Sequence, residues 1–126
     1  MNNATMSRIA TIAYAVVIIV FGVTHFASSQ DMRNFVPAFV PGGGVWVYIT
    51  GTLLVAAGLA FLLNRQLRLA GILLAVLLLS FALTIHLPRL IDGNTSGLGQ
   101  ILKDVGLAAG ALLIASLGTD RQMVTA

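Results

Sequence analysis

The stretch Leu69–Pro88 reads LAGILLAVLLLSFALTIHLP and contains no Asp, Glu, Lys or Arg over twenty residues. A helix of about 20 mostly apolar residues crosses the roughly 30 Å hydrocarbon core of a bilayer. Three further stretches without these charged residues lie at 9–30, 34–64 and 105–119. The pattern predicts four membrane-spanning helices, at about 8–27, 45–63, 67–90 and 98–118.

The composition excludes an ordinary soluble domain. Hydrophobic residues make up 58% of the 126 residues and charged residues 9%, against about 45–50% and about 25% in soluble domains. Disordered chains are poor in apolar residues, so they are excluded as well. The absence of cysteine removes disulfides and thiolate chemistry. The net charge of +3 is spread over loops, so we expect a lipid bilayer as partner and no nucleic acid.

The fourth uncharged stretch, 105–119, is too short to span the bilayer. Its fifteen residues reach only about 22 Å as a helix. The fourth helix is therefore predicted to begin near Leu98 and to carry Lys103 and Asp104 within its first two turns. This start places two ionisable side chains at or below the level of the lipid head groups.

The second uncharged stretch is too long for one helix and begins with the loop sequence NFVPAFVPGGG at 34–44. Prolines and successive glycines disfavour a regular helix there. Aromatic residues collect at the membrane boundary, and several flank this stretch. We predict an interfacial or shallow re-entrant loop at 30–44; an ordinary extracytoplasmic loop is the alternative.

The short connections favour an all-α, up-down-up-down four-helix membrane bundle, forming one domain over 1–126. Small residues allow membrane helices to pack closely, and they recur in the second helix and at Gly106 and Gly110 of the fourth. On the first helix, one face is predicted to point into the bundle, with Thr11, Tyr14, Ile18, Gly22 and His25. The other face is predicted to contact lipid, with Val16, Ile19, Val20 and Val23.

Positive residues favour the cytoplasmic side of a membrane. One side of the predicted bundle carries four of them, Arg8, Arg65, Arg68 and Arg121, and the other side carries three, Arg33, Arg89 and Lys103. We therefore expect a multi-pass membrane protein with both termini in the cytoplasm. A cleaved signal peptide loosely fits the first segment, but cleavage would discard His25 and leave three spans.

Six polar side chains are predicted to lie near one, extracytoplasmic, face of the membrane: His25, His86, Arg89, Gln100, Lys103 and Asp104. Ionisable groups in membrane segments are costly and commonly mark function or a buried pairing. Taken singly, each can instead be a snorkelling or interfacial residue. Their convergence from three helices favours a shared ligand-binding pocket, although no catalytic residue can be assigned.

The chemistry of this group favours a quinone, because quinone carbonyls need hydrogen-bond donors such as His, Arg or Lys. An anionic lipid head group or a small oxyanion would suit the same cations. A haem held by His25 and His86 is disfavoured, because both lie near the membrane edge and nothing else marks a porphyrin site. Two histidines without Cys or Glu make a poor metal site, so no metal is expected.

Several motifs occur in a recognisable order: FGVTHF at 21–26, the Pro37 and Pro41-Gly42 loop, WVYITG at 46–51, and HLPR at 86–89. Together they resemble the DoxX-like family of small four-helix bacterial membrane proteins over about 9–117. The resemblance implies a four-helix fold and a location in a bacterial inner membrane. It also implies a link to quinone chemistry, because the family takes its name from a subunit associated with a thiosulfate:quinone oxidoreductase. It carries no catalytic motif that can be transferred to this chain.

Three functional hypotheses follow. The first is a redox-associated membrane protein that binds a quinone or another lipophilic ligand near the extracytoplasmic face. The alternative is a non-enzymatic accessory or assembly subunit of a larger membrane complex, because the chain leaves almost no extramembrane domain. The expected protein partner is another membrane protein or, in the other hypotheses, a second copy of the chain in a homo-oligomer. A transporter or channel comes third, because four short helices need oligomerisation to enclose a pore.

Overall fold

The computed structural model describes residues 1–118, which are helical except for short turns and contain no strand. Arg121, one of the positive residues counted above, lies outside this range. The elements follow in the order α1 (Asn3–Ala27), α2 (Ser29–Met32), η1 (Arg33–Phe35), α3 (Val45–Leu62), α4 (Leu67–Phe81), η2 (Ala82–His86), α5 (Leu87–Ile91) and α6 (Ser96–Ser116). Element η2 is a π-helical turn, and it joins α4 to α5 in one continuous span.

Four helical segments are long and apolar enough to span a membrane: Asn3–Ala27, Val45–Leu62, Leu67–Ile91 and Ser96–Ser116. Large hydrophobic side chains remain exposed along all four, among them Val20, Leu53, Leu83 and Leu113. Contact of such surfaces with lipid has no cost, whereas their exposure to water is unfavourable. The chain is therefore a multi-pass membrane protein with a four-helix bundle, as the sequence predicts.

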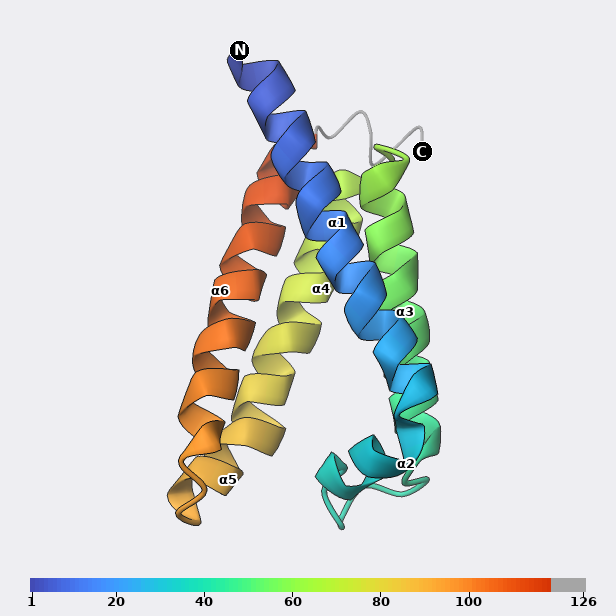
Figure 1. The fold of residues 1–126 in the computed structure, drawn as a ribbon, viewed down its shortest axis with the longest axis vertical. Helices are drawn as coiled ribbons and strands as arrows, with labels where there is room; N and C mark the ends of the chain where they lie inside the picture. The colour runs from blue at the N-terminus through green and yellow to red at the C-terminus, as the bar shows by residue number, and fades with distance from the viewer. Residues whose placement is uncertain (119–126) are drawn as a thin grey trace.

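The bundle consists of two closely packed helix pairs. Helix α1 packs on α3, and α4 packs on α6, while α3 and α4 contact each other less. Figure 1 shows the two pairs close together near the N-terminus and diverging toward the opposite end, which carries α2 and α5. We call this opposite end the open end of the bundle, and the end near the N-terminus the closed end.

Glycine permits the close approach in both pairs. A Cβ atom on Gly58 of α3 would lie 2.4 Å from Ile19 Cγ1 and 3.0 Å from the Ala15 carbonyl oxygen. A Cβ atom on Gly71 of α4 would lie 2.5 Å from the Ala111 carbonyl oxygen of α6. Real Cβ atoms do not approach a backbone this closely, so the helix axes can be this near only where no side chain intervenes.

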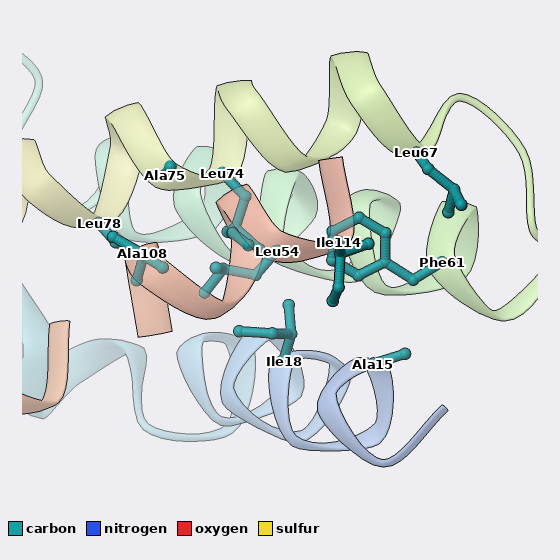
Figure 2. Packing of buried hydrophobic residues seen from close by; sticks show 11 residues of the cluster. Ala15, Ile18, Leu54, Phe61, Leu67, Leu74, Ala75, Leu78, Ala108 and Ile114 are labelled. Carbon is teal, nitrogen blue, oxygen red and sulfur yellow. The ribbon is translucent and has the colours of Figure 1, made fainter. Parts of the chain in front are cut away.

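The hydrophobic core joins the two pairs toward the closed end. Figure 2 shows Phe61 of α3 beside Ile114 of α6, with Ile18 of α1 and Leu74 of α4 nearby. Phe61 is completely buried, and its ring lies 5.9 Å from the ring of Tyr14. The core continues from Phe61 to the cavity at the open end, because its members Ile18, Leu54 and Leu78 also line that cavity.

Two details of the predicted packing are wrong. Ile19 was expected to contact lipid, but it is half-buried against Gly58. Gly106 was expected at a helix contact, but it is exposed, and a Cβ atom there would meet nothing within 4 Å. The small residues that α6 presents to α4 are instead Ala111 and Ala115.

The helix ends differ from the prediction for local reasons. Helix α1 begins at Asn3 because the Asn2 side chain accepts a hydrogen bond from the Thr5 backbone N–H at 2.8 Å. Helix α6 begins at Ser96, after a turn in which Asn94 accepts hydrogen bonds from Ser96. This earlier start puts Lys103 and Asp104 in the third turn of α6, deeper than the predicted first two turns.

The loop between the first two spanning helices contains two short helical turns, α2 and η1, before it becomes irregular over 36–44. The predicted loop began at Gln30, whereas the helical turn of α2 already begins at Ser29. Glycines 42 and 43 have positive φ values of 98° and 48°, which explains the successive glycines before α3. We call the segment 29–44 the aromatic loop. It lies at the open end of the bundle (Figure 1).

Candidate functional site

A cavity of about 410 Å³ lies at the open end, between the two helix pairs. We call it the site cavity. Its lining is mostly apolar: Ile18, Val20, Phe21, Met32, Phe35, Val36, Trp46, Val47, Leu54, Leu78, Phe81, Ile85 and Leu107. Its polar lining residues are Thr24, His25, Thr50, His86, Gln100, Lys103 and Asp104. An apolar cleft of about 300–1,000 Å³ with a few polar groups is typical of small-molecule sites.

Asp104 is the most unusual of these residues, because its side chain is only 2% exposed. One carboxylate oxygen, Oδ1, lies 3.6 Å from Lys103 Nζ. The other, Oδ2, lies 3.2 Å from His86 Nε2. That contact does not have the geometry of a hydrogen bond, so Oδ2 has no hydrogen-bond partner. A buried carboxylate oxygen without a donor is costly, and such a group in a native fold requires an explanation.

Lys103 and Gln100 form the outer side of the polar group. The Lys103 ammonium donates to Gln100 Oε1 at 2.7 Å and lies 5.2 Å from the centre of the Phe21 ring. Its side chain is 41% exposed. Lys103 therefore reaches the edge of the cavity, while its neighbour Asp104 stays inside the bundle.

His86 owes its position to the π-helical turn η2. Pro88 has no N–H to donate to the Thr84 carbonyl, and a regular helix would bring its ring against that carbonyl. The chain widens instead, and the Leu87 N–H bonds to the Ala82 carbonyl, five residues back. The extra residue in this turn changes the direction of His86, which now points at Asp104. The helix thus accommodates Pro88 by a π turn.

His25 approaches the cavity from α1. Its Nδ1 lies 2.7 Å from the Phe21 carbonyl oxygen. A carbonyl can only accept, so Nδ1 carries the proton of this bond, and in the neutral ring Nε2 is left as an acceptor. Within residues 1–118, no protein group is bonded to that Nε2.

The structure brings five of the six predicted site residues to this cavity: His25, His86, Gln100, Lys103 and Asp104. Arg89 does not line it. Its guanidinium lies 4.5 Å from the centre of the Phe35 ring, and Phe35 in turn lines the cavity. Arg89 therefore links α5 to the aromatic loop by a cation–π contact.

Sequence reasoning missed Thr24, Thr50 and Trp46 as lining residues. Trp46 was interpreted only as an interfacial aromatic. Thr50 stands in an otherwise apolar part of α3, and the Thr24 hydroxyl already donates to the Phe21 carbonyl. Because threonine is common in membrane helices, no local signal separates these residues from ordinary ones. Only the packing of α3 beside α1 brings them to the site.

The polar groups of the site are suited to hydrogen bonding and charge stabilisation. Among residues 1–118, no three His, Cys, Asp or Glu side chains gather closely enough to hold a metal ion. His25 and Asp104 offer acceptors, while Lys103 and Gln100 offer donors nearer the surface. The site can thus orient a ligand that has an apolar body and a polar ring or head group.

A family model described as a domain of unknown function, DUF8561, matches residues 14–117. The chain belongs to the DUF8561 family. The matched range extends from Tyr14 in α1 to Leu117 after α6, so it includes every residue that lines the site cavity. No curated protein and no solved structure matches the chain.

Proposed function

We propose that this DUF8561 protein binds a lipophilic molecule with a hydrogen-bonding head group, of the quinone and quinol class, in the site cavity. The observation that carries the proposal is Oδ2 of Asp104, which accepts no hydrogen bond although it is buried beside an apolar cavity. A ligand that donates a hydrogen bond to this oxygen removes the cost of leaving it without a donor. The resemblance to DoxX-like proteins supports the same class of ligand and a redox-associated role.

The arrangement of donors and acceptors favours the reduced form of such a ligand. A quinol carries two hydroxyl groups, which can donate to Asp104 Oδ2 and to Nε2 of His25. A quinone carries only carbonyl acceptors, which can use donors such as Lys103, Gln100 or the Thr50 hydroxyl but leave Asp104 Oδ2 and His25 Nε2 without a donor. Leaving a buried group unpaired discriminates strongly between ligands, so we expect the quinol to bind more tightly than the quinone.

The cavity also has a suitable size and position. Its volume of about 410 Å³ falls within the range of small-molecule sites. Aromatic side chains line it from three directions, with Phe21 on α1, Trp46 on α3 and Phe81 on α4. These side chains provide flat apolar surfaces for a ring, while an isoprenoid tail could lie along the lipid-facing helices.

Trp46 makes the proposal measurable, because it is the only tryptophan in the chain and it lines the cavity. A quinone that binds there should quench its fluorescence. We would titrate the purified protein in lipid nanodiscs with decylubiquinone, and then measure displacement by decylubiquinol under anaerobic conditions. We expect decylubiquinone to quench the fluorescence saturably. We expect decylubiquinol to reverse this quenching at concentrations below those at which the quinone produces it.

Two variants make this test specific. Asp104→Asn should weaken quinol binding at least about tenfold, which corresponds to about 1.4 kcal/mol. Leu83→Ala is the control, because Leu83 is 65% exposed on the neighbouring span Leu67–Ile91 and does not line the cavity. Quenching that rises linearly without saturation, and equally in all three proteins, would show partitioning into lipid and would refute the proposal.

We further propose that both termini face the cytoplasm of a bacterial inner membrane. The open end would then lie at the extracytoplasmic face. The sequence supports this orientation by four positive residues against three, with Arg8, Arg65, Arg68 and Arg121 assigned to the side of the termini and Arg33, Arg89 and Lys103 to the other.

A further inference from the structure

A second, smaller cavity of about 210 Å³ lies in the aromatic loop, between α2 and the start of α3. It shares no lining residue with the site cavity. Ser29, Gln30, Arg33, Gly44 and Tyr48 contribute to its walls. A water molecule occupies about 30 Å³ of the liquid, so this space is large enough for a polar group of several heavy atoms.

Arg33 supplies the charge of this cavity. Among residues 1–118, no carboxylate lies within ion-pair distance of its guanidinium, so the positive charge has no protein counter-ion. The guanidinium rests against the backbone at Gly44, where a Cβ atom would lie 3.2 Å from Nη2 and 3.4 Å from Nε. A glycine at this position therefore lets the guanidinium lie close to the turn.

Two hydroxyl groups add donors to the guanidinium. Ser29 Oγ lies 3.0 Å from the Tyr48 hydroxyl oxygen. Only one proton lies between the two oxygens, so the other hydroxyl proton is free to be donated elsewhere. Guanidinium and hydroxyl donors without a facing carboxylate are the chemistry that recognises a phosphate oxygen.

The start of α3 does not itself provide the donors. The backbone N–H groups of Val45, Trp46 and Val47 bond to the carbonyls of the glycine turn at 3.1 Å each. Recognition therefore depends on the side chains of Arg33, Ser29 and Tyr48.

We propose that this second cavity binds a phosphate group. A phospholipid head group and free phosphate offer the same chemistry, and the position of the loop beside four apolar helices favours the lipid. Phe39 in the same loop is 80% exposed, as expected of an aromatic residue at the head-group level. Such a bound lipid would fasten the aromatic loop to the membrane surface beside the site cavity.

Native mass spectrometry of the detergent-purified protein tests the proposal, with phosphatidylglycerol as the probe and dioleoylglycerol, which lacks phosphate, as the control lipid. We expect one phosphatidylglycerol molecule to remain bound at activation energies that remove the others and all dioleoylglycerol. Arg33→Gln should weaken retention of this molecule at least about tenfold. Arg65→Gln, which removes an exposed arginine from the turn at the other end of the bundle, should not.

Gly44→Val separates a built cavity from charge attraction alone. Gly44 has helical φ and ψ values of −61° and −19°, which valine can adopt, and the variant keeps every charge while its side chain displaces the guanidinium. We expect the same loss as with Arg33→Gln. Full retention in Gly44→Val, or equal loss in Arg65→Gln, would overturn the proposal.

A second arm distinguishes the two sources of phosphate. Inorganic phosphate is added to the delipidated protein, and its binding is followed by thermal unfolding in wild type and Arg33→Gln. A shift in wild type alone, without selective retention of phosphatidylglycerol, would assign the cavity to free phosphate. Absence of both effects in wild type would refute a phosphate site altogether.

Discussion

Asp104 and Lys103 are neighbours in the sequence, but they meet very different surroundings. The Lys103 side chain is 41% exposed, while that of Asp104 is 2% exposed. A long flexible side chain can carry its ammonium group to the head-group region, whereas a short carboxylate must stay at the depth of its backbone. The energetic cost of this ion pair therefore falls mainly on Asp104.

Asp104→Leu should separate the functional role of this residue from a structural one. Replacing a buried carboxylate by an apolar group of similar size removes its desolvation cost, and Lys103 remains hydrated without its partner. We expect the midpoint of thermal unfolding in detergent to stay equal or to rise, while quinol displacement in the Trp46 assay is lost. A marked fall of the midpoint would instead show that Asp104 holds the bundle together.

At the residue scale, the sequence predicted the unusual position of Lys103 and Asp104 from arithmetic alone, because fifteen uncharged residues cannot span a bilayer. It did not predict which oxygen of Asp104 lacks a donor. It also treated Arg8 only as a topology marker, although Arg8 donates to the carbonyls of Phe61 and Leu62 at the end of α3. Such partners lie more than fifty residues away and depend on the packing of α1 on α3.

Among the helices, glycine position matters more than glycine frequency. The sequence marks Gly106 and Gly110 as a small-residue motif on α6, but only Gly110 has a close neighbour, the Tyr14 ring. Gly71 receives no special signal from its surroundings, yet it is the point where α4 meets the backbone of α6. A spacing rule identifies a possible contact surface, and the rotation of the helix about its axis determines which surface is used.

Gly71→Ala and Gly106→Ala form a matched pair of the same substitution. The new methyl group at 71 would lie 2.5 Å from the Ala111 carbonyl oxygen, so α4 and α6 must separate. We expect a loss of about 1–3 kcal/mol, as for other overpacked contacts. In Gly106→Ala the new methyl group would have no neighbour within 4 Å, so the free energy of unfolding should stay unchanged or rise by up to about 1 kcal/mol. Reversible unfolding in mixed micelles would measure both, and equal effects would contradict the close contact at Gly71.

For the whole molecule, the two helix pairs create the site by diverging. They are held together by the core around Phe61 at the closed end, and the cavity occupies the space between them at the open end. All four spanning segments contribute lining residues, so the walls of the site come from the bundle itself. The face of the membrane on which the cavity opens depends on the orientation of the whole bundle.

Single cysteines can test this orientation, because the natural chain contains none. Asp92 lies in the exposed turn before α6, and Arg65 lies in the exposed turn between α3 and α4. With both termini in the cytoplasm, a membrane-impermeant maleimide added to intact bacteria should label Asp92→Cys. Arg65→Cys should be labelled only after lysis. The reverse pattern would place the cavity at the cytoplasmic face.

The sequence by itself determined the number of spanning helices and their class, because a bilayer requires about 20 apolar residues per helix and charges cannot be hidden along them. It also identified most of the polar side chains that line the cavity, since ionisable residues in such segments are rare. The tertiary structure alone decided that α1 pairs with α3 and α4 with α6. It also decided that Arg89 points at Phe35, and that Asp104 keeps one oxygen unpaired. These features depend on helix rotation and on contacts between distant residues. The sequence does not reveal them, because the side chains that face lipid and those that face protein are both apolar.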